Sequence, residues 1–518
     1  MTGGLVQLAA VGIEDQYIIR DPQITYFKII YRRHTNFSIE SIRQNFIHTP
    51  DFGNRVTCIV SKNGDLMGNT HLVVTLPKVK EFTTDGQLDN ITKFAWARKI
   101  GYALINSINI EIGGEIINEH YGEWLNIWSE LTQPLYANYE RMIGNVSELF
   151  DYTNGKDEYT LYVPLQFWFC QSSMLAIPLV ALQHADIKIN IDFNTFDKCY
   201  LIAPTHYIET EQDLVNFTQF EYIEQNINGT IASGQFVYFD PVLKRLYYTK
   251  ISDNDFQTMK ITESDYTPAN RRKLTYNLSN SGYWVKGLES NEFAMPRFNT
   301  KVLTHTYNKK DLNATKIKDC YLLIDYIYID SDEREKFITS RHDYLIEQLQ
   351  YTGEKPLEGA TRNIKIDLKH PCTMLAWVVQ LNYYKNTTNN DHFNYTNSYR
   401  YSNNKPQGRS LIEQGTVLLN SLERLSFRDY SYYNYVQPYE HFKHNPSEGI
   451  NVYGFALFPD NIDQPSGSSN MTQLDNIVLK LSLIPEVTLT NPAKARIYAL
   501  NKNILRINFG LSGLVFAR

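Results

Sequence analysis

The amino-acid sequence predicts an all-β protein of the sandwich or barrel class, built from two related β-domains. Its 518 residues include 37 Tyr, 26 Phe and 6 Trp, and aromatic side chains favour pleated, half-buried strands. Short runs of alternating apolar residues, separated by Gly, Pro, Asn and Asp, dominate the chain, whereas long amphipathic helices are few. One strand pattern also occurs in both halves, which indicates an internal duplication.

The strand-like runs follow one another along the whole chain. A run that begins at Thr70 stops at Pro77, because proline cannot donate to a strand ladder. Ile108, Ile110 and Ile112 alternate, and Gly113-Gly114 supplies the positive φ that a tight hairpin turn requires. Further runs are YVPLQFWF, ADIKINIDF, CYLLIDYIYID, IKIDL, INVYGFALF, NIVLKLSL and ARIYALNKNILRINF.

Helical patterns are rare in this sequence. We expect one short helix over Tyr121–Leu131 and another over Glu333–Ile346.

The duplication is carried by Val180–Phe193 and Met471–Leu483. Each places four apolar residues in strict alternation, and each follows an aromatic strand and a loop that contains proline. This order indicates a duplicated β-domain, with coincidence as the alternative. Between the copies, a polar stretch of over a hundred residues follows Phe193 and is interpreted as an insertion in the first domain. A second stretch, Asn382–Ser410, is poor in apolar residues and predicts a long exposed loop.

Charge and cysteine content exclude several classes of protein. The formal net charge is −6, whereas a nucleic-acid-binding protein should carry a basic excess. No apolar run reaches the roughly 18 residues that a membrane-spanning helix needs, and the N-terminus makes a poor signal peptide. The cysteines are odd in number and widely spaced, so they favour a reducing compartment over a zinc site or a disulfide framework: Cys58, Cys170, Cys199, Cys320 and Cys372.

Motifs for catalysis or metal binding are weak. The acidic stretch Asp330–Glu335 resembles the start of a calcium loop, but Glu335 replaces the glycine at its sixth position, so a solvated turn before a helix is favoured. His120 has no second histidine four residues away, as a zinc-binding helix requires, and is expected to be a surface or packed residue. Common hydrolase, nucleotide and dinucleotide motifs are missing; the paired carboxylates of a glycosidase stay open. We expect no cofactor, no metal and no catalytic residue.

Two aromatic stretches have more than one interpretation. Arg428–His444 could be a platform for a sugar or a base, but packing of strands and loops is favoured. The stretch Asp21–Ile42 mixes aromatic residues with four basic ones, as nucleic-acid surfaces do. In an acidic chain, an N-terminal arm or an ion-paired contact with a neighbour is the better interpretation. These four residues are the candidate assembly contacts: Lys28, Arg32, Arg33 and His34.

An ordered series of segments resembles the major capsid proteins of nucleocytoplasmic large DNA viruses, the family of phycodnaviruses, mimiviruses, iridoviruses and marseilleviruses. The series begins with GGLVQLAAVGIEDQYIIRDPQITYFKIIYRRHTNFSIESI and continues through IEIGGEIINEHYGEWLNIWSELT, LAIPLVALQHADIKINI, LLIDYIYIDSDEREKF and GINVYGFALFPDNIDQPSGSSN. It covers nearly the whole chain except the insertion and Asn382–Ser410. The chain departs from the family's Met- and Gly-rich pattern near its end, at residues 506–514.

The resemblance implies a double jelly roll, that is, two eight-stranded antiparallel sandwiches in tandem with long loop insertions. It implies an N-terminal arm over residues 1–24 and a first jelly roll over 25–340, with a large insertion at about 204–318. The second jelly roll would occupy residues 341–518. Segments 133–162, 204–318 and 382–410 would then be outward-facing loops.

The resemblance also implies a function in a shell. Family members form homotrimers whose six jelly rolls make a pseudo-hexagonal capsomer, and these capsomers tile an icosahedral capsid. Expected partners are other copies of the chain, minor capsid and penton proteins, and the inner viral membrane through the N-terminal arm. Assembly in the host cytoplasm and no direct nucleic-acid binding are expected. The alternative is a jelly-roll protein that binds carbohydrate or processes glycans.

Overall fold

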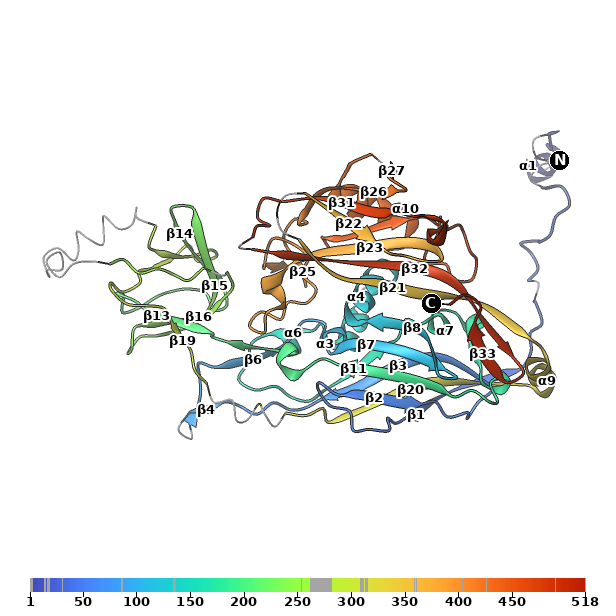
Figure 1. Ribbon diagram of the computed structural model, residues 1–518, viewed down its shortest axis with the longest axis horizontal. Coiled ribbons are helices and arrows are strands. Elements are labelled where there is room, and N and C mark those ends of the chain that lie inside the picture. Colours follow the sequence, from blue (N-terminus) through green and yellow to red (C-terminus); the bar gives the residue numbers. More distant parts are fainter. Residues whose placement is uncertain are drawn as a thin grey trace, which may run out of the picture.

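The computed structural model confirms an all-β protein, with 43% of its residues in strands and 16% in helices. It describes residues 3–13, 15, 19–29, 31–84, 87–133, 137–252, 254–260, 282–307, 312, 315–357, 359, 361–402, 404–424, 426–489 and 491–517. Two sandwiches form the body, an insertion projects from one end, and the N-terminal segment leaves the other end (Figure 1). No helix in these ranges is long and apolar enough to cross a membrane.

The first sandwich consists of two antiparallel sheets around one core. Its five-stranded sheet has the order β1-β20-β3-β10, with β9 also paired to β3, and its four-stranded sheet has the order β2-β11-β7-β8. The bounds are β1 Phe37–Gln44, β2 Arg55–Ile59, β3 Leu66–Leu76, β7 Ile105–Ile112, β8 Glu115–Tyr121, β9 Tyr159–Pro164, β10 Ile177–Pro178, β11 Ile187–Phe193 and β20 Asp319–Ile329.

Sequence alternation explains this core. Ile187, Ile189 and Ile191 on β11 are each at most 1% exposed, because successive side chains leave a strand on opposite faces. The β7–β8 hairpin turns at Gly113 and Gly114, whose φ values of 60° and 88° suit a tight primed turn. The predicted hairpin is therefore confirmed.

The second sandwich repeats the arrangement. A six-stranded sheet has the order β21-β32-β23-β29, with β30 and β33 at its edges, and a five-stranded sheet has the order β22-β31-β26-β27, with β28 paired to β26. The bounds are β21 His342–Leu357, β22 Thr361–Ile366, β23 Pro371–Leu381, β26 Ile412–Leu419, β27 Leu422–Glu423, β28 Arg428–Asp429, β29 Ile450–Gly454, β30 Ser469–Asn470, β31 Ile477–Leu483, β32 Ala493–Asn508 and β33 Leu511–Leu514. Each sandwich has more strands than the eight that the resemblance implies, because short strands pair at the edges of its sheets.

A helix of the first sandwich, α4 (Gly122–Thr132), covers the outer face of the second. On β23, Trp377 and Val379 point into the second core, whereas Met374, Ala376 and Val378 meet α4. Both faces of this strand are buried, which explains its continuous apolar sequence. The α4 side chains in this contact are Trp124, Ile127, Trp128 and Leu131.

The insertion is a folded unit with its own core. Its seven-stranded sheet has the order β18-β17-β14-β15-β16-β13-β19, and Ile208, Phe236 and Tyr248 are among its buried residues. The bounds are β13 His206–Glu209, β14 Tyr222–Ile227, β15 Thr230–Asp240, β16 Arg245–Lys250, β17 Val285–Gly287, β18 Phe293–Ala294 and β19 Leu303–Thr304. Residues 253, 261–281, 308–311, 313 and 314 of this predicted insertion lie outside the described residues.

Smaller elements complete the described chain. They are α1 Gly3–Ala9, α3 Ile100–Ala103, α5 Ala137–Ile143, α6 Ser147–Phe150, α7 Trp168–Gln171, α9 Ser331–Thr339, α10 Gln437–His441, β4 Thr83–Thr84, β5 Gln87–Leu88, β6 Lys93–Trp96, β12 Tyr200–Ala203, β24 Tyr401–Ser402 and β25 Lys405–Pro406.

The structure corrects two sequence-based expectations. The helix predicted over Glu333–Ile346 ends at Thr339, and His342 begins β21, because pairing along β32 outweighs the local helical preference of the segment. The stretch Asn382–Ser410 is a loop but not an exposed one. Tyr384 packs into the second core, Tyr395 packs beside α4, and the asparagines bond backbone carbonyls. The buried residues of this loop include Tyr384, Asn390, Asn394, Tyr395 and Thr396.

Candidate assembly segment and inter-sandwich junction

The four candidate assembly residues lie on an exposed segment that precedes the first strand. Lys28, Arg32, Arg33 and His34 are all exposed, and β1 begins only at Phe37, where it pairs with β20. In the described part of the chain, no ion pair involves the lysine or the two arginines. The Nδ1 atom of His34 lies 2.7 Å from the carbonyl oxygen of Thr35.

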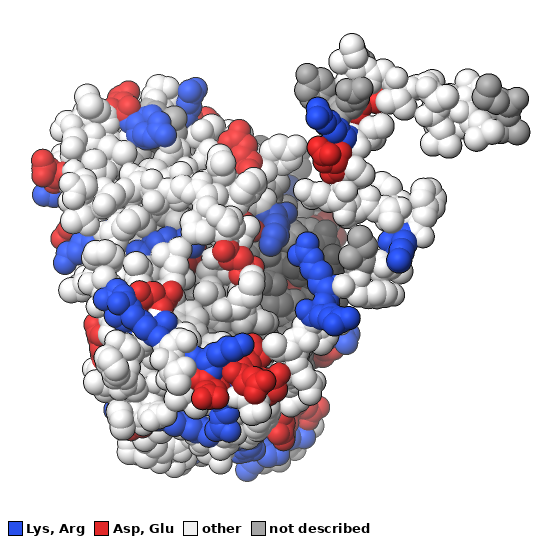
Figure 2. All heavy atoms as spheres, turned by 90° about the vertical axis from the view of Figure 1, so that its right-hand side faces the viewer, with Lys and Arg blue, Asp and Glu red and all other residues white. Residues whose placement is uncertain are grey.

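The same segment exposes large apolar side chains. Tyr26, Phe27 and Tyr31 are 91%, 99% and 82% exposed, and α1 adds the exposed Leu5 and Leu8. The segment stands away from the body (Figure 2). On the face of the body that Figure 2 shows, Lys and Arg are interspersed with Asp and Glu. Exposed apolar residues next to unpaired cations are typical of a segment that orders on a protein or membrane partner.

A buried charged network joins the two sandwiches. Arg496 of β32 is 2% exposed; its Nη2 atom donates to Glu123 Oε1 at 2.7 Å and to Gln380 Oε1 at 2.6 Å. The Nε atom of Arg496 also donates to the Glu123 carboxylate, and the Tyr498 hydroxyl donates to Oε2 at 2.6 Å. Burial alone would raise the pKa of Glu123, but Arg496 outweighs it and holds this pKa below its usual range.

A second buried ion pair lies at the other end of α4. The Nζ atom of Lys99 donates to Glu130 Oε1 and to Asn126 Oδ1, both at 2.6 Å. Glu130 Oε2 accepts the Ser447 backbone N–H of the second sandwich at 2.6 Å. Burial opposes ionisation of Glu130, yet Lys99 lowers the pKa of this carboxyl below its usual value. Both ends of α4 are therefore fixed by charge as well as by apolar contact.

The other residues that the sequence singled out have packing roles. His120 is 2% exposed and stacks on Phe167 with a ring-centroid distance of 4.6 Å, as expected for a packed residue. Asp330 caps α9 by accepting the Glu333 backbone N–H at 3.0 Å, which confirms the turn before a helix. No group of three metal-ligating residues forms within the described ranges.

The aromatic stretch Arg428–His444 packs, but largely as helix. Residues Tyr432–Val436 form one π-helical turn, and α10 follows it. The Tyr433 ring lies 5.1 Å from Trp377 in the second core, and its hydroxyl donates to the Gly415 carbonyl at 2.9 Å. Packing is confirmed, while the expected strand covers only Arg428–Asp429.

Comparison with known families gives two matches that lie in order along the chain. Residues 25–242 match the family described as major capsid protein N-terminus, and residues 333–513 match large eukaryotic DNA virus major capsid protein. Probable capsid protein 4 of Acanthamoeba polyphaga mimivirus is 41% identical, with 100% of this chain and 99% of the relative covered. The major capsid protein of Phaeocystis pouchetii virus is 30% identical over 100% of both chains.

Solved structures share the fold at low identity. The Faustovirus major capsid protein gives a TM-score of 0.65 at 11% identity, with 96% of this chain and 94% of that chain covered. The PBCV-1 virus capsid gives 0.60 at 23% identity, with 95% and 100% covered. These neighbours are double jelly-roll proteins, so the two sandwiches are jelly rolls, as the resemblance implied.

Proposed function

Because the chain belongs to the family of major capsid proteins of large eukaryotic DNA viruses, we propose that three copies associate into one pseudo-hexagonal capsomer of an icosahedral shell. As a capsid protein, the chain is part of the virion, and its relatives are structural proteins, a family not known for enzymatic activity. Three chains with two jelly rolls each give six similar units in a closed ring with threefold symmetry.

The contact of α4 with the second sandwich carries this proposal. A hexagonal outline requires the two jelly rolls of one chain to keep a fixed relative position. Trp124, Ile127, Trp128 and Leu131 bury this contact, and the Arg496–Glu123 and Lys99–Glu130 pairs lie beside it. A hinged pair of domains would not tile a shell.

We propose the domain limits that the resemblance implies: an arm over 1–24, a first jelly roll over 25–340 with an insertion at about 204–318, and a second over 341–518. The insertion and the N-terminal segment leave opposite ends of the molecule (Figure 1). This polarity supports an outward insertion and an arm on the inner side. Segment 133–162, which contains α5, α6 and the start of β9, and segment 382–410 would face outward with the insertion; residues 134–136 lie outside the described ones.

The N-terminal segment is the proposed contact between capsomers and other inner components. Its exposed aromatic and basic residues suit a neighbouring capsomer, a minor capsid or penton protein, or the headgroups of the inner viral membrane. Nucleic acid is not expected as a partner, and assembly is expected in the host cytoplasm.

Electron microscopy of the purified protein tests the proposal. We expect particles with a pseudo-hexagonal outline and a threefold axis in class averages. Class averages that show only isolated single chains, each with two jelly rolls, at a protein concentration high enough for association would contradict it.

A further inference from the structure

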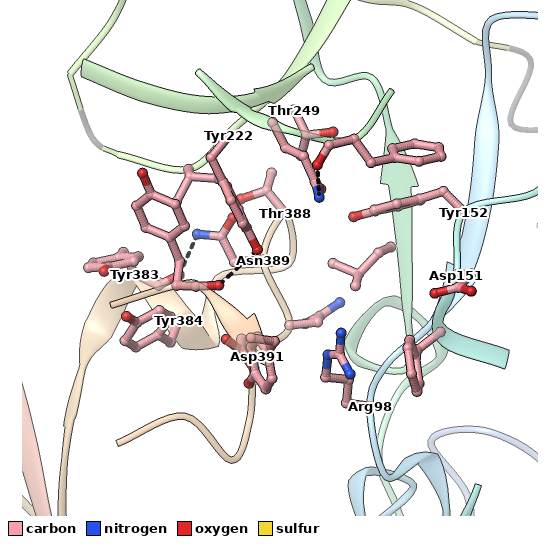
Figure 3. Close-up of a pocket in the computed structure, with 18 of the residues that line it drawn as sticks. Arg98, Asp151, Tyr152, Tyr222, Thr249, Tyr383, Tyr384, Thr388, Asn389 and Asp391 are labelled. Atoms are coloured by element: carbon pink, nitrogen blue, oxygen red, sulfur yellow. Dashed lines mark hydrogen bonds between the residues drawn. The ribbon is translucent and has the colours of Figure 1, made fainter. Parts of the chain in front are cut away.

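A cavity of about 540 Å³ lies where three parts of the chain meet (Figure 3). The first sandwich contributes Arg98 and Tyr152, the insertion contributes Tyr222 and Thr249, and the loop Asn382–Ser410 contributes Asp391. This volume is in the range of pockets that bind small organic ligands, roughly 300–1,000 Å³.

Aromatic rings dominate the wall, and hydrogen bonds hold several of them in place. The Tyr399 hydroxyl donates to Glu224 Oε1 at 2.8 Å, and the Tyr222 hydroxyl donates to the Tyr399 carbonyl at 3.2 Å. Tyr152 stacks on Phe220 with centroids 5.6 Å apart. The rings that line the cavity are Phe150, Tyr152, Phe220, Tyr222, Tyr383, Tyr384, Tyr399 and Tyr401.

Buried polar atoms without partners occur on residues of the same wall. Arg98 Nη1, Thr249 Oγ1 and Asn390 Oδ1 are buried and form no hydrogen bond within the described structure. The Arg98 guanidinium is stacked between Phe150 and Tyr401, whose ring centroids lie 3.9 and 4.1 Å from its central carbon. An unpaired buried polar group costs free energy, so a ligand that bonds these atoms gains affinity.

The charges of the wall select against an anion. Arg98 is the one cation among the lining residues, whereas Asp151 and Asp391 are both acids. Asp391 already accepts hydrogen bonds from the Tyr401 hydroxyl and, at 2.9 Å, from Asn394 Nδ2. Burial raises the pKa of Asp391, so a phosphate or carboxylate would meet one arginine, the Asp151 carboxylate and a desolvated acid that offers it no positive charge.

We propose that this cavity binds a neutral saccharide. A sugar ring has apolar C–H faces that stack on aromatic rings, and hydroxyl groups that both donate and accept hydrogen bonds. Its hydroxyls would accept from Arg98 Nη1, donate to Asn390 Oδ1 and bond Thr249 Oγ1 after small shifts of these side chains, because the three atoms have almost no surface open to the cavity in the unbound structure. Thr249 and Gln235 are opposite each other in the β15–β16 register, so both side chains leave the sheet on the cavity side.

The test measures binding of neutral sugars to the purified full-length protein. The probes are the methyl glycosides of glucose, galactose, mannose, fucose and N-acetylglucosamine, followed by saturation-transfer NMR and calorimetric titration. We expect at least one probe to bind, and Thr249→Val to weaken it about three- to tenfold through loss of one hydrogen bond. The matched control is Thr352→Val, which removes another buried, unpartnered hydroxyl outside the cavity and should change affinity less than about twofold.

Three results would overturn the proposal. They are no binding of any probe, equal weakening by Thr249→Val and Thr352→Val, or binding of inorganic phosphate or a mononucleotide in place of the sugars. Native mass and melting temperature of each variant are measured in parallel. Unchanged values assign any loss of sugar binding to the cavity and separate it from a failure to assemble.

Discussion

The guanidinium of Arg496 on β32 donates from Nη2 to Glu123 Oε1 of α4 at 2.7 Å, although 373 residues separate the two in sequence. Arg496 is 2% exposed, so the bond forms out of contact with water. Since α4 belongs to the first jelly roll and β32 to the second, the pair makes one rigid unit of two domains. The proposed capsomer would need this rigidity, because the distance between the two jelly rolls of each chain would set its outline.

Removal of Glu123 should destabilise the protein strongly. Glu123→Ala leaves the buried Arg496 charge with the Glu354 carboxylate, 3.3 Å from Nη1, in place of two carboxylates, and loss of a buried ion-pair partner typically costs about 3–5 kcal/mol. Denaturant unfolding followed by circular dichroism measures the loss. The control is Asp157→Ala at the exposed Lys78–Asp157 pair, with an expected cost below about 1 kcal/mol. Equal costs for both variants would contradict the structural role of the Arg496–Glu123 pair.

Loss of the α4 contact should free the two halves from each other. Trp128 is 2% exposed, and Trp128→Ala should cost about 3–5 kcal/mol of stability and open the chain to limited proteolysis between the jelly rolls. Leu422→Ala, at a position that is 75% exposed, is the control and should leave the digestion pattern unchanged. Wild-type proteolysis kinetics in the Trp128 variant would show that α4 does not hold the domains together.

Acid should loosen the loop Asn382–Ser410 through His392. Burial lowers the pKa of His392 to about 4, and the ring bonds the Lys198 carbonyl at 2.7 Å. As the pH falls, His392 is protonated in the unfolded chain before it is protonated in the folded protein. Its contribution to the free energy of unfolding is therefore complete above pH 6.5 and is lost as the pH falls towards 4. Between pH 6.5 and 4, the free energy of unfolding should fall by about 1–2 kcal/mol less in His392→Gln than in the wild type; this range allows for the partial exposure of the ring. Parallel pH profiles of the two proteins would refute this assignment.

Charge reversal in the N-terminal segment should impair assembly and leave folding intact. Arg32→Glu with Arg33→Glu changes two exposed residues that lie before β1, so the melting temperature should stay near the wild-type value. The affinity of one capsomer for another, measured by light scattering as a function of protein concentration, should fall at least about tenfold. Lys260→Glu with Lys301→Glu on the insertion, at two exposed lysines, is the matched control. If both double variants assemble like the wild type, the segment is not an assembly contact.

Strand alternation was enough to predict much of the fold. The runs through Ile187–Phe193 and Ile477–Leu483 form equivalent strands of the two sandwiches, and the Gly113-Gly114 hairpin turns as expected. The helix predicted after Glu333 ended early because the length of β21 depends on its partner β32, far away in sequence. Long-range pairing of this kind leaves little trace in local propensity.

The junctions were harder to predict than the strands. Arg496, Glu123 and Glu130 look like surface charges in the sequence. Arg496 and Glu123 pair across the two halves of the chain, whereas Glu130 pairs with Lys99 of its own half and accepts the Ser447 backbone N–H of the other half. One signal was available: β23 is apolar on both faces, which requires a second layer such as α4. The loop Asn382–Ser410 was predicted to be exposed because asparagine and tyrosine score as polar, although their side chains bond and fill the domain junction.

The native mass of the purified soluble protein, measured by light scattering, shows whether three chains associate. One chain has a mass of 60.2 kDa, and we expect a single species at three times this value, about 181 kDa. A well-folded species at 60.2 kDa that does not change with concentration would contradict a self-associating capsomer.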